Sequence, residues 1–148
     1  MLDQTVIGAC SKCGFSIAAC ICENKGSPKL SVTKKFKFDA AHKLPNYKGK
    51  CKNLHGHGFY GEVEFFGPVN EKTGMVIDFS EIKSHIAYYI IQYLDHSYLN
   101  DILENPTAEN LVLWIVLKLR GINWGKNVEL TRIRLYETED SYAEWRKN

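Results

Sequence analysis

Three of the five histidines, together with Cys51, lie in one short stretch that runs from His42 to His57. Only Gly56 separates His55 from His57, and alternate residues of an extended chain point to the same face, so both imidazoles can reach one ion. His42 ends a predicted strand and could supply a third nitrogen from the neighbouring strand. Three neutral nitrogens with an open fourth position are the donor set of catalytic zinc. We therefore predict a metal site at these three histidines; the alternative is ordinary polar or core histidines.

Cys51 lies four residues before His55, in a polar loop that contains glycine and lysine. A thiol beside a cation loses its proton more readily, and the thiolate can then act as a base. We therefore predict a catalytic role for Cys51. The alternative is a buried, inert thiol. His85, in the first predicted helix, is expected to have a structural role.

Residues 1–30 differ in composition from the rest of the chain and end in a Gly-Ser-Pro turn signal. They are interpreted as an appendage that carries Cys10, Cys13, Cys20 and Cys22. The first pair resembles a zinc knuckle, and four thiolates would form a closed, structural zinc site. Because the gap between the pairs is only six residues, a redox-active dithiol or simply reduced cysteines remain alternatives.

Residues 31–148 are expected to form one domain. The 148 residues include 19 basic and 17 acidic side chains, a net charge of +2, and this balance argues against binding to nucleic acid or an anionic membrane. The longest strongly apolar run, 111–117, is too short to cross a bilayer, and the N-terminus lacks the pattern of a secretory signal. We expect a cytoplasmic protein with reduced thiols.

Hydrophobic periodicity predicts four strands and two helices. The helices are expected to begin after Asp78 and after Thr107, two residues that cap helix N-termini. The second segment is apolar nearly all round, so a short buried strand is the alternative there. A slip in the alternation between Leu130 and Ile133 predicts a β-bulge. The strands are expected at 30–38, 58–66, 127–137 and 141–145.

The order strand, strand, helix, helix, strand, strand indicates an α+β fold, in which helices cover one face of an antiparallel sheet. Six short motifs along this order resemble the 6-pyruvoyl-tetrahydropterin synthase family. The gap of three residues between Cys51 and His55-Gly56-His57 is similar to the branch that makes 6-carboxy-5,6,7,8-tetrahydropterin for 7-deazaguanine (queuosine) biosynthesis. The motifs are residues 38–42, 51–57, 74–79, 94–100, 106–110 and 136–138.

The resemblance implies a tunnelling fold (T-fold), with two helices on a four-stranded antiparallel sheet. Subunits would join into trimeric barrels that stack as a homohexamer, with active sites between subunits. The implied reaction is that of a zinc-dependent lyase: 7,8-dihydroneopterin triphosphate would give 6-carboxytetrahydropterin, acetaldehyde and triphosphate. Formation of 6-pyruvoyl-tetrahydropterin from the same substrate is the alternative. A non-catalytic zinc-binding interaction module is a more remote one, and the donor set alone leaves iron or manganese open.

Further site residues follow from the resemblance. Asp95 and His96 would form a proton-transfer pair, in which the carboxylate orients the imidazole. Glu137 would anchor the pterin through paired hydrogen bonds to its amino group and ring nitrogen. Thr107 and Glu109 would line the pterin pocket, although Thr107 is equally plausible as a helix cap.

The triphosphate requires cations, and a group of lysines flanks the predicted metal site. A solvated charged loop explains these lysines equally well, so the sequence does not show which of them contact phosphate. They are Lys43, Lys48, Lys50 and Lys52.

Overall fold

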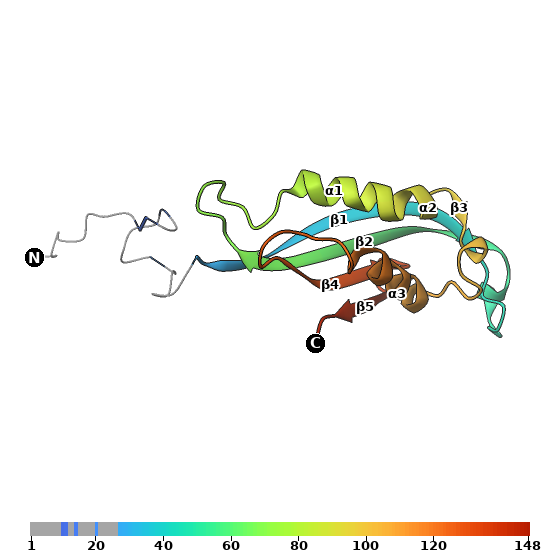
Figure 1. The fold of residues 1–148 in the computed structure, drawn as a ribbon. Coiled ribbons are helices and arrows are strands. Elements are labelled where there is room, and N and C mark those ends of the chain that lie inside the picture. Colours follow the sequence, from blue (N-terminus) through green and yellow to red (C-terminus); the bar gives the residue numbers. More distant parts are fainter. Residues whose placement is uncertain (1–9, 12–13, 15–19, 21–26) are drawn as a thin grey trace, which may run out of the picture.

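A computed structural model describes residues 10, 11, 14, 20 and 27–148 of the chain. Its centre is a five-stranded sheet with the strand order β3-β1-β2-β4-β5 (Figure 1). The described part of the chain contains no helix long and apolar enough to cross a membrane. The strands are β1 (Lys29–His42), β2 (His55–Pro68), β3 (Ser97–Tyr98), β4 (Glu129–Tyr136) and β5 (Tyr142–Arg146).

The long hairpin of β1 and β2 carries the predicted metal ligands at one end. The two strands pair in antiparallel register from Lys29 opposite Pro68 to His42 opposite His55. Along β1 the buried positions alternate with more exposed ones, so His42 shares its face with the core residue Phe38. The end of the hairpin therefore places histidine side chains on the core side of the sheet.

The expectation of four strands is wrong by one, because Ser97–Tyr98 form a fifth, β3. This strand pairs in parallel with Ala40 and Ala41 of β1. Two residues are too few to show a hydrophobic period, so the strand had no signal in the sequence. It forms because the N–H of His96 donates to the carbonyl of Asp39 over 2.7 Å, which aligns the following residues with β1.

The first helical segment begins as predicted, since the Asp78 side chain accepts a hydrogen bond from the Ser80 N–H over 2.7 Å. It runs as one continuous stretch with a π-helical turn in the middle: α1 (Phe79–Ile86), η3 (Ala87–Ile91) and α2 (Gln92–Leu94). The four residues predicted to repeat along its inner face are all buried. They are Ile82, Ile86, Ile90 and Leu94.

The second helix, α3 (Ala108–Leu119), settles the choice between helix and buried strand in favour of the helix. Its N-cap is Thr107, whose hydroxyl accepts from the Asn110 N–H over 3.2 Å. Six of its twelve residues are buried, which explains why the segment is so apolar. The predicted bulge is also confirmed: Leu130 pairs with Phe65 and Arg132 with Glu64, so Thr131 is the extra residue.

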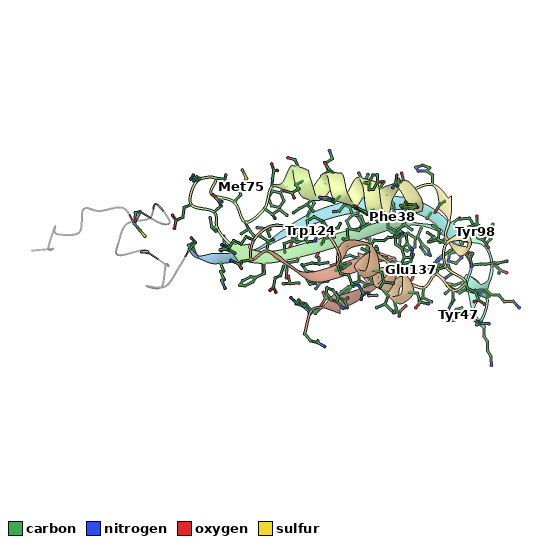
Figure 2. All side chains as sticks on the ribbon, in the orientation of Figure 1. Phe38, Tyr47, Met75, Tyr98, Trp124 and Glu137 are labelled. Carbon is green, nitrogen blue, oxygen red and sulfur yellow. The ribbon has the colours of Figure 1, made fainter. Side chains whose placement is uncertain are left out.

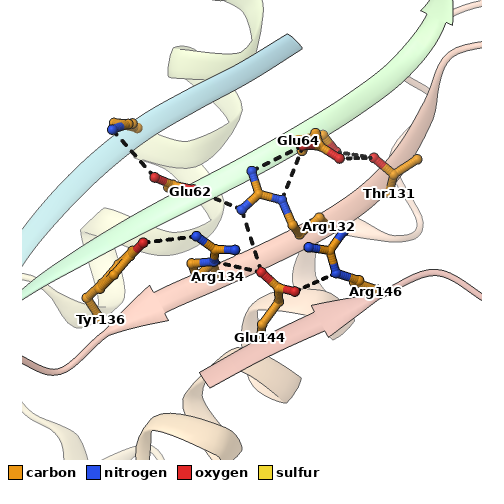
Figure 3. A network of polar contacts seen from close by, with 9 residues as sticks. Glu62, Glu64, Thr131, Arg132, Arg134, Tyr136, Glu144 and Arg146 are labelled. Atoms are coloured by element: carbon orange, nitrogen blue, oxygen red, sulfur yellow. Dashed lines mark hydrogen bonds and ion pairs between the residues drawn. The ribbon is translucent and has the colours of Figure 1, made fainter. Parts of the chain in front are cut away.

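The two faces of the sheet differ in chemistry. One face packs under the helices in a single apolar core that includes Phe59, Ile115 and Leu135; Figure 1 shows α1 and α2 running along β1 on this side. The other face carries an ion-pair network centred on Arg132, which is 8% exposed (Figure 3). Its guanidinium contacts the carboxylates of Glu62, Glu64 and Glu144 at 2.9, 3.1 and 3.6 Å.

Candidate metal centre

The three predicted metal ligands meet at one end of the β1–β2 hairpin. His42 lies directly opposite His55 in the strand register, and His57 points to the same face as His55 because it is two residues further along β2. The ring centroids lie 4.6 Å apart for His42 and His55 and 5.1 Å apart for His42 and His57. The geometry therefore brings all three imidazoles together, as the spacing predicted.

Glu137 is the fourth member of this cluster. It follows the last residue of β4, and one donor atom from each of the four side chains lies within 4.8 Å of all the others. Its Oε1 atom is 3.4 Å from Nε2 of both His42 and His57. Sequence reasoning placed Glu137 at the pterin and missed its contact with the histidines. No local pattern indicates that contact, because it depends on how β4 pairs with β2.

The imidazole nitrogens are arranged for metal binding. The Nε2 atoms of His42, His55 and His57 are all buried without a hydrogen-bond partner among the described residues. Nδ1 of His42 donates to the Pro106 carbonyl over 2.9 Å, and Nδ1 of His55 donates to the Asn53 carbonyl over 2.7 Å. A proton on Nδ1 leaves the Nε2 lone pair directed into the cluster, which is the usual arrangement in metal-binding histidines.

Burial and charge act together on the cluster. The contact with His42 is the main reason that the pKa of Glu137 lies below its usual value, so the carboxylate is ionised at neutral pH. Burial lowers the pKa of His57, and the nearby His42 and His55 add to this effect. Burial also acts to lower the pKa of His42, but contact with Glu137 and the Pro106 carbonyl outweighs it and raises the pKa. A carboxylate among buried, unsatisfied imidazoles fits a divalent cation.

Cys51 lies in the loop that joins the two histidine-bearing strand ends. It occupies the middle of a 3₁₀ turn, Lys50–Lys52, and its carbonyl accepts a hydrogen bond from the Leu44 N–H over 2.9 Å. The residue is half-buried. The loop therefore holds Cys51 between the strand that ends at His42 and the strand that begins at His55.

Asp95 and His96 contact each other through the turn expected at the helix end. His96 has a left-handed backbone with φ of 55°, and this turn lets adjacent side chains meet, with Nδ1 of His96 3.0 Å from Oδ2 of Asp95. The His96 side chain is 80% exposed. His96 and His57 line the same shallow cavity of about 440 Å³ at the edge of the sheet. The pair therefore lies at the edge of the sheet, beside the part of β1 that leads to His42.

The remaining predicted site residues that the structure describes lie outside the histidine cluster. Thr107 serves as the N-cap of α3, and Glu109 is exposed in the first turn of that helix. The four lysines around the hairpin loop are all exposed. Cys13 and Cys22 lie outside the described residues. Cys10 accepts a hydrogen bond at its carbonyl from the Gly14 N–H over 2.8 Å.

A second, larger cavity of about 1010 Å³ lies at the far end of the hairpin. It is bordered by the loop after β2 and by the segment before β4, and its lining includes Pro68, Trp124 and Lys126. None of the histidines in the cluster contributes to it. The histidine cluster therefore lies away from this cavity, at the opposite end of the hairpin. Figure 2 shows the labelled Glu137 and Tyr98 toward that end of the molecule.

Comparison with known proteins agrees with this arrangement. Residues 31–148 match the family described as 6-pyruvoyl tetrahydropterin synthase. The chain belongs to this family. The family expected from the six motifs is thus confirmed, and with it the expectation that the chain is an enzyme.

Relatives of this 6-pyruvoyl tetrahydropterin synthase family member differ in their named activities. The chain is 46% identical over 94 residues to a 6-carboxy-5,6,7,8-tetrahydropterin synthase of Synechocystis, covering 60% of this chain and 73% of the relative. It is 38% identical over 109 residues to a dihydroneopterin monophosphate aldolase of Pyrococcus furiosus, covering 74% and 90%. The family therefore includes relatives with different named activities.

The fold is shared with a solved member of the family. The structure of Caenorhabditis elegans 6-pyruvoyl tetrahydropterin synthase superposes with a TM-score of 0.73 at 24% identity, covering 83% of this chain and 99% of that one. The predicted α+β tunnelling fold is confirmed, with two helical segments on an open, mostly antiparallel sheet of five strands.

Proposed function

We propose that this protein is a zinc-dependent lyase that converts 7,8-dihydroneopterin triphosphate to 6-carboxy-5,6,7,8-tetrahydropterin, with release of acetaldehyde and triphosphate. The observation that carries the proposal is the cluster of three buried Nε2 atoms of His42, His55 and His57, none with a hydrogen-bond partner among the described residues. The short gap between Cys51 and His55 and the resemblance to the Synechocystis enzyme support the carboxy product.

The three histidines would hold the zinc, which would supply Lewis acidity toward the side-chain hydroxyls of the substrate. Cys51, on the loop between the ligand strands, would remove and return protons at the side-chain carbons. His96 would act as a second proton-transfer group, with Asp95 fixing the orientation of its ring. These residues all lie toward one end of the hairpin, where the proposal places the substrate side chain.

Binding and orientation of the pterin would depend on Glu137, whose ionised carboxylate can accept paired hydrogen bonds from the pterin amino group and ring nitrogen. Thr107 and Glu109, at the start of α3, would line the pocket beside the Pro106 carbonyl that holds His42. The exposed lysines of the hairpin loop would attract the triphosphate. They are Lys43, Lys48, Lys50 and Lys52.

Two related activities are the alternatives. Formation of 6-pyruvoyl-tetrahydropterin would use the same substrate but retain the terminal carbons of its side chain. An aldolase acting on dihydroneopterin monophosphate is favoured by the 38% identity to the Pyrococcus furiosus protein. The three activities differ in substrate phosphorylation and in whether acetaldehyde is released, so one product assay separates them.

The assay incubates the purified, zinc-loaded full chain with dihydroneopterin triphosphate and, in parallel, with the monophosphate. Acetaldehyde and 6-carboxytetrahydropterin from the triphosphate, abolished in Cys51→Ala and His55→Ala, are the expected result. A 6-pyruvoyl product without acetaldehyde, or cleavage of the monophosphate alone, would assign the protein to one of the sister activities. No turnover of either substrate by a folded, metal-loaded sample would favour a non-catalytic interaction module.

We further propose that the protein acts in the cytoplasm, in 7-deazaguanine (queuosine) biosynthesis, as a homohexamer built from two trimeric barrels. The open sheet supports a barrel, because its two edges at β3 and β5 leave backbone groups available for pairing with neighbouring subunits. No nucleic acid or membrane is proposed as a partner. Sedimentation velocity of the full chain tests the assembly, and a monomer at micromolar concentration would contradict it.

A further inference from the structure

The position of Glu137 suits a metal ligand as well as a pterin anchor. Its Oε1 atom is equally distant, at 3.4 Å, from Nε2 of His42 and of His57. This separation is longer than an ordinary hydrogen bond. Two donors that each lie about 2.0–2.1 Å from one tetrahedral ion are separated by about 3.3–3.4 Å. The spacing therefore matches two ligands of a common ion better than it matches direct hydrogen bonds.

The surroundings of Glu137 point the same way. Its side chain is 26% exposed, against 21% for His57 and 0% for His42, so the carboxylate lies at the partly open side of the cluster. One of its carboxylate oxygens lies beside two imidazole nitrogens of the cluster. A charged oxygen donor completes the set of three nitrogens to four, which is the coordination number of a closed zinc site.

We propose that Glu137 is the fourth metal ligand in the substrate-free protein, and that its transfer from the metal to the pterin opens the coordination site for the substrate hydroxyls. This inference rests on the proposed function, because it assigns the same carboxylate to the pterin ring. Paired hydrogen bonds to the pterin use both carboxylate oxygens, so Glu137 cannot make them and bind the metal fully at the same time. Binding of the pterin ring is therefore coupled to the release of a coordination position on the metal. The metal site is therefore closed until a pterin arrives.

The backbone permits this exchange. Glu137 lies in the short connection between β4 and β5, where its N–H donates to the Ser141 carbonyl over 3.1 Å. That bond holds the backbone while leaving the side chain able to change rotamer. Two of the histidines are held more firmly, since Nδ1 of His42 donates to the Pro106 carbonyl and Nδ1 of His55 donates to the Asn53 carbonyl. The glutamate side chain is therefore freer to move than these two donors.

The test uses cobalt-loaded full chain, because the visible absorption of cobalt reports its ligands without any turnover. Glu137→Gln removes the charged donor with little change in shape, and Glu139→Gln, at an exposed position two residues further on, is the matched control. The N-terminal cysteines are the same in all three proteins, so differences between the spectra report on residue 137. Far-UV circular dichroism checks that each variant is folded.

We expect Glu137→Gln to bind cobalt at least about tenfold more weakly than wild type, by competition with a chelator, and to show a changed visible spectrum. Glu139→Gln should match wild type in both measurements. Addition of 6-methylpterin, which has the ring edge but no hydroxylated side chain, should shift the wild-type spectrum toward that of Glu137→Gln.

Identical cobalt affinity and spectrum in Glu137→Gln and Glu139→Gln would overturn the inference. A wild-type spectrum that does not change when 6-methylpterin binds would contradict the proposed transfer of Glu137 from the metal to the pterin. In both cases the histidine site and the proposed lyase activity would stand, because the product assay tests them separately. If the wild-type chain bound no metal at the histidines, the zinc dependence of the proposed function would fail together with the inference.

Discussion

The backbone N–H of Asp39 donates a hydrogen bond to Oδ1 of Asp95 over 3.0 Å, across 56 positions of sequence. This bond ties the end of α2 to β1 three residues before His42. The second carboxylate oxygen of Asp95 remains directed at Nδ1 of His96. One side chain thus anchors the helix end to the metal-bearing strand and orients the neighbouring imidazole.

Asp95→Asn should separate these two tasks. The amide oxygen can still accept from the Asp39 N–H, but the negative charge beside His96 is lost. Because Asp95 acts through His96 as a positioning residue, we expect kcat to fall by about 10- to 100-fold while KM changes little. Steady-state kinetics would show this, with Asp101→Asn, on the exposed turn after β3, as the control. An equal effect of the control would contradict the assigned role.

Removal of one clustered histidine should abolish zinc binding, whereas removal of a histidine elsewhere should not. His55→Ala deletes a donor whose Nε2 is buried without a hydrogen-bond partner among the described residues. His85 stacks on Tyr89 and contacts the Trp124 ring edge-to-face, outside the cluster. Metal analysis after dialysis should therefore show one zinc fewer per chain in His55→Ala than in His85→Ala. The same zinc content in both variants would argue against the histidine site.

Substitution of Arg132, on the polar face of the sheet, should lower the free energy of unfolding more than substitution of Arg146. Arg132→Ala removes the cation that Glu62 and Glu64 share, whereas the Arg146 side chain is 62% exposed and contacts only Glu144 among the described residues. We expect Arg132→Ala to lower the free energy of unfolding by about 1–3 kcal/mol and Arg146→Ala by less than about 1 kcal/mol. Urea denaturation measures both values, and the reverse ranking would refute the role given to Arg132.

The same network predicts a loss of stability in acid. Burial acts to raise the pKa values of Glu62 and Glu144, but their arginine partners outweigh it and lower both below the usual 4.5. A carboxyl with a lower pKa in the folded state stabilises the fold above its unfolded pKa, and this contribution is lost as pH falls through the folded pKa. The free energy of unfolding should therefore decline below about pH 4.5.

Substitution checks the origin of that decline. Glu62→Gln has no carboxyl to protonate, so the variant should be less stable at neutral pH and should lose less stability on acidification than wild type. Denaturation curves at pH 7 and pH 3.5 give both differences. If acidification cost the variant as much as wild type, the pH dependence would have to arise elsewhere.

The N-terminal appendage should affect metal content but not the reaction. We propose that Cys10, Cys13, Cys20 and Cys22 bind a second, structural zinc, and that 31–148 form the catalytic domain. Deletion of residues 1–28 should then remove one zinc per chain and leave turnover unchanged, because β1 begins at Lys29. Metal analysis and the product assay test the two parts separately. Lost activity in a folded, truncated enzyme would contradict this separation.

Local patterns determined the parts of the fold that repeat within a few residues. The alternation along β1 and β2, and the His55-Gly56-His57 spacing, predicted three imidazoles on one face, because strand geometry repeats every two residues. The caps at Asp78 and Thr107 were readable because each side chain bonds a backbone N–H within three residues. Such features need no knowledge of distant segments.

Tertiary structure decided the contacts that join distant segments. Glu137 meets His42 only because β4 pairs with β2 beside β1, and β3 exists only because the chain after α2 returns to Asp39. Neither contact leaves a period in the sequence, since its geometry depends on strand register and helix packing along the whole domain. The sequence alone determines which side chains could donate to a metal. Only the folded chain brings Glu137 to the three histidines and so completes the cluster.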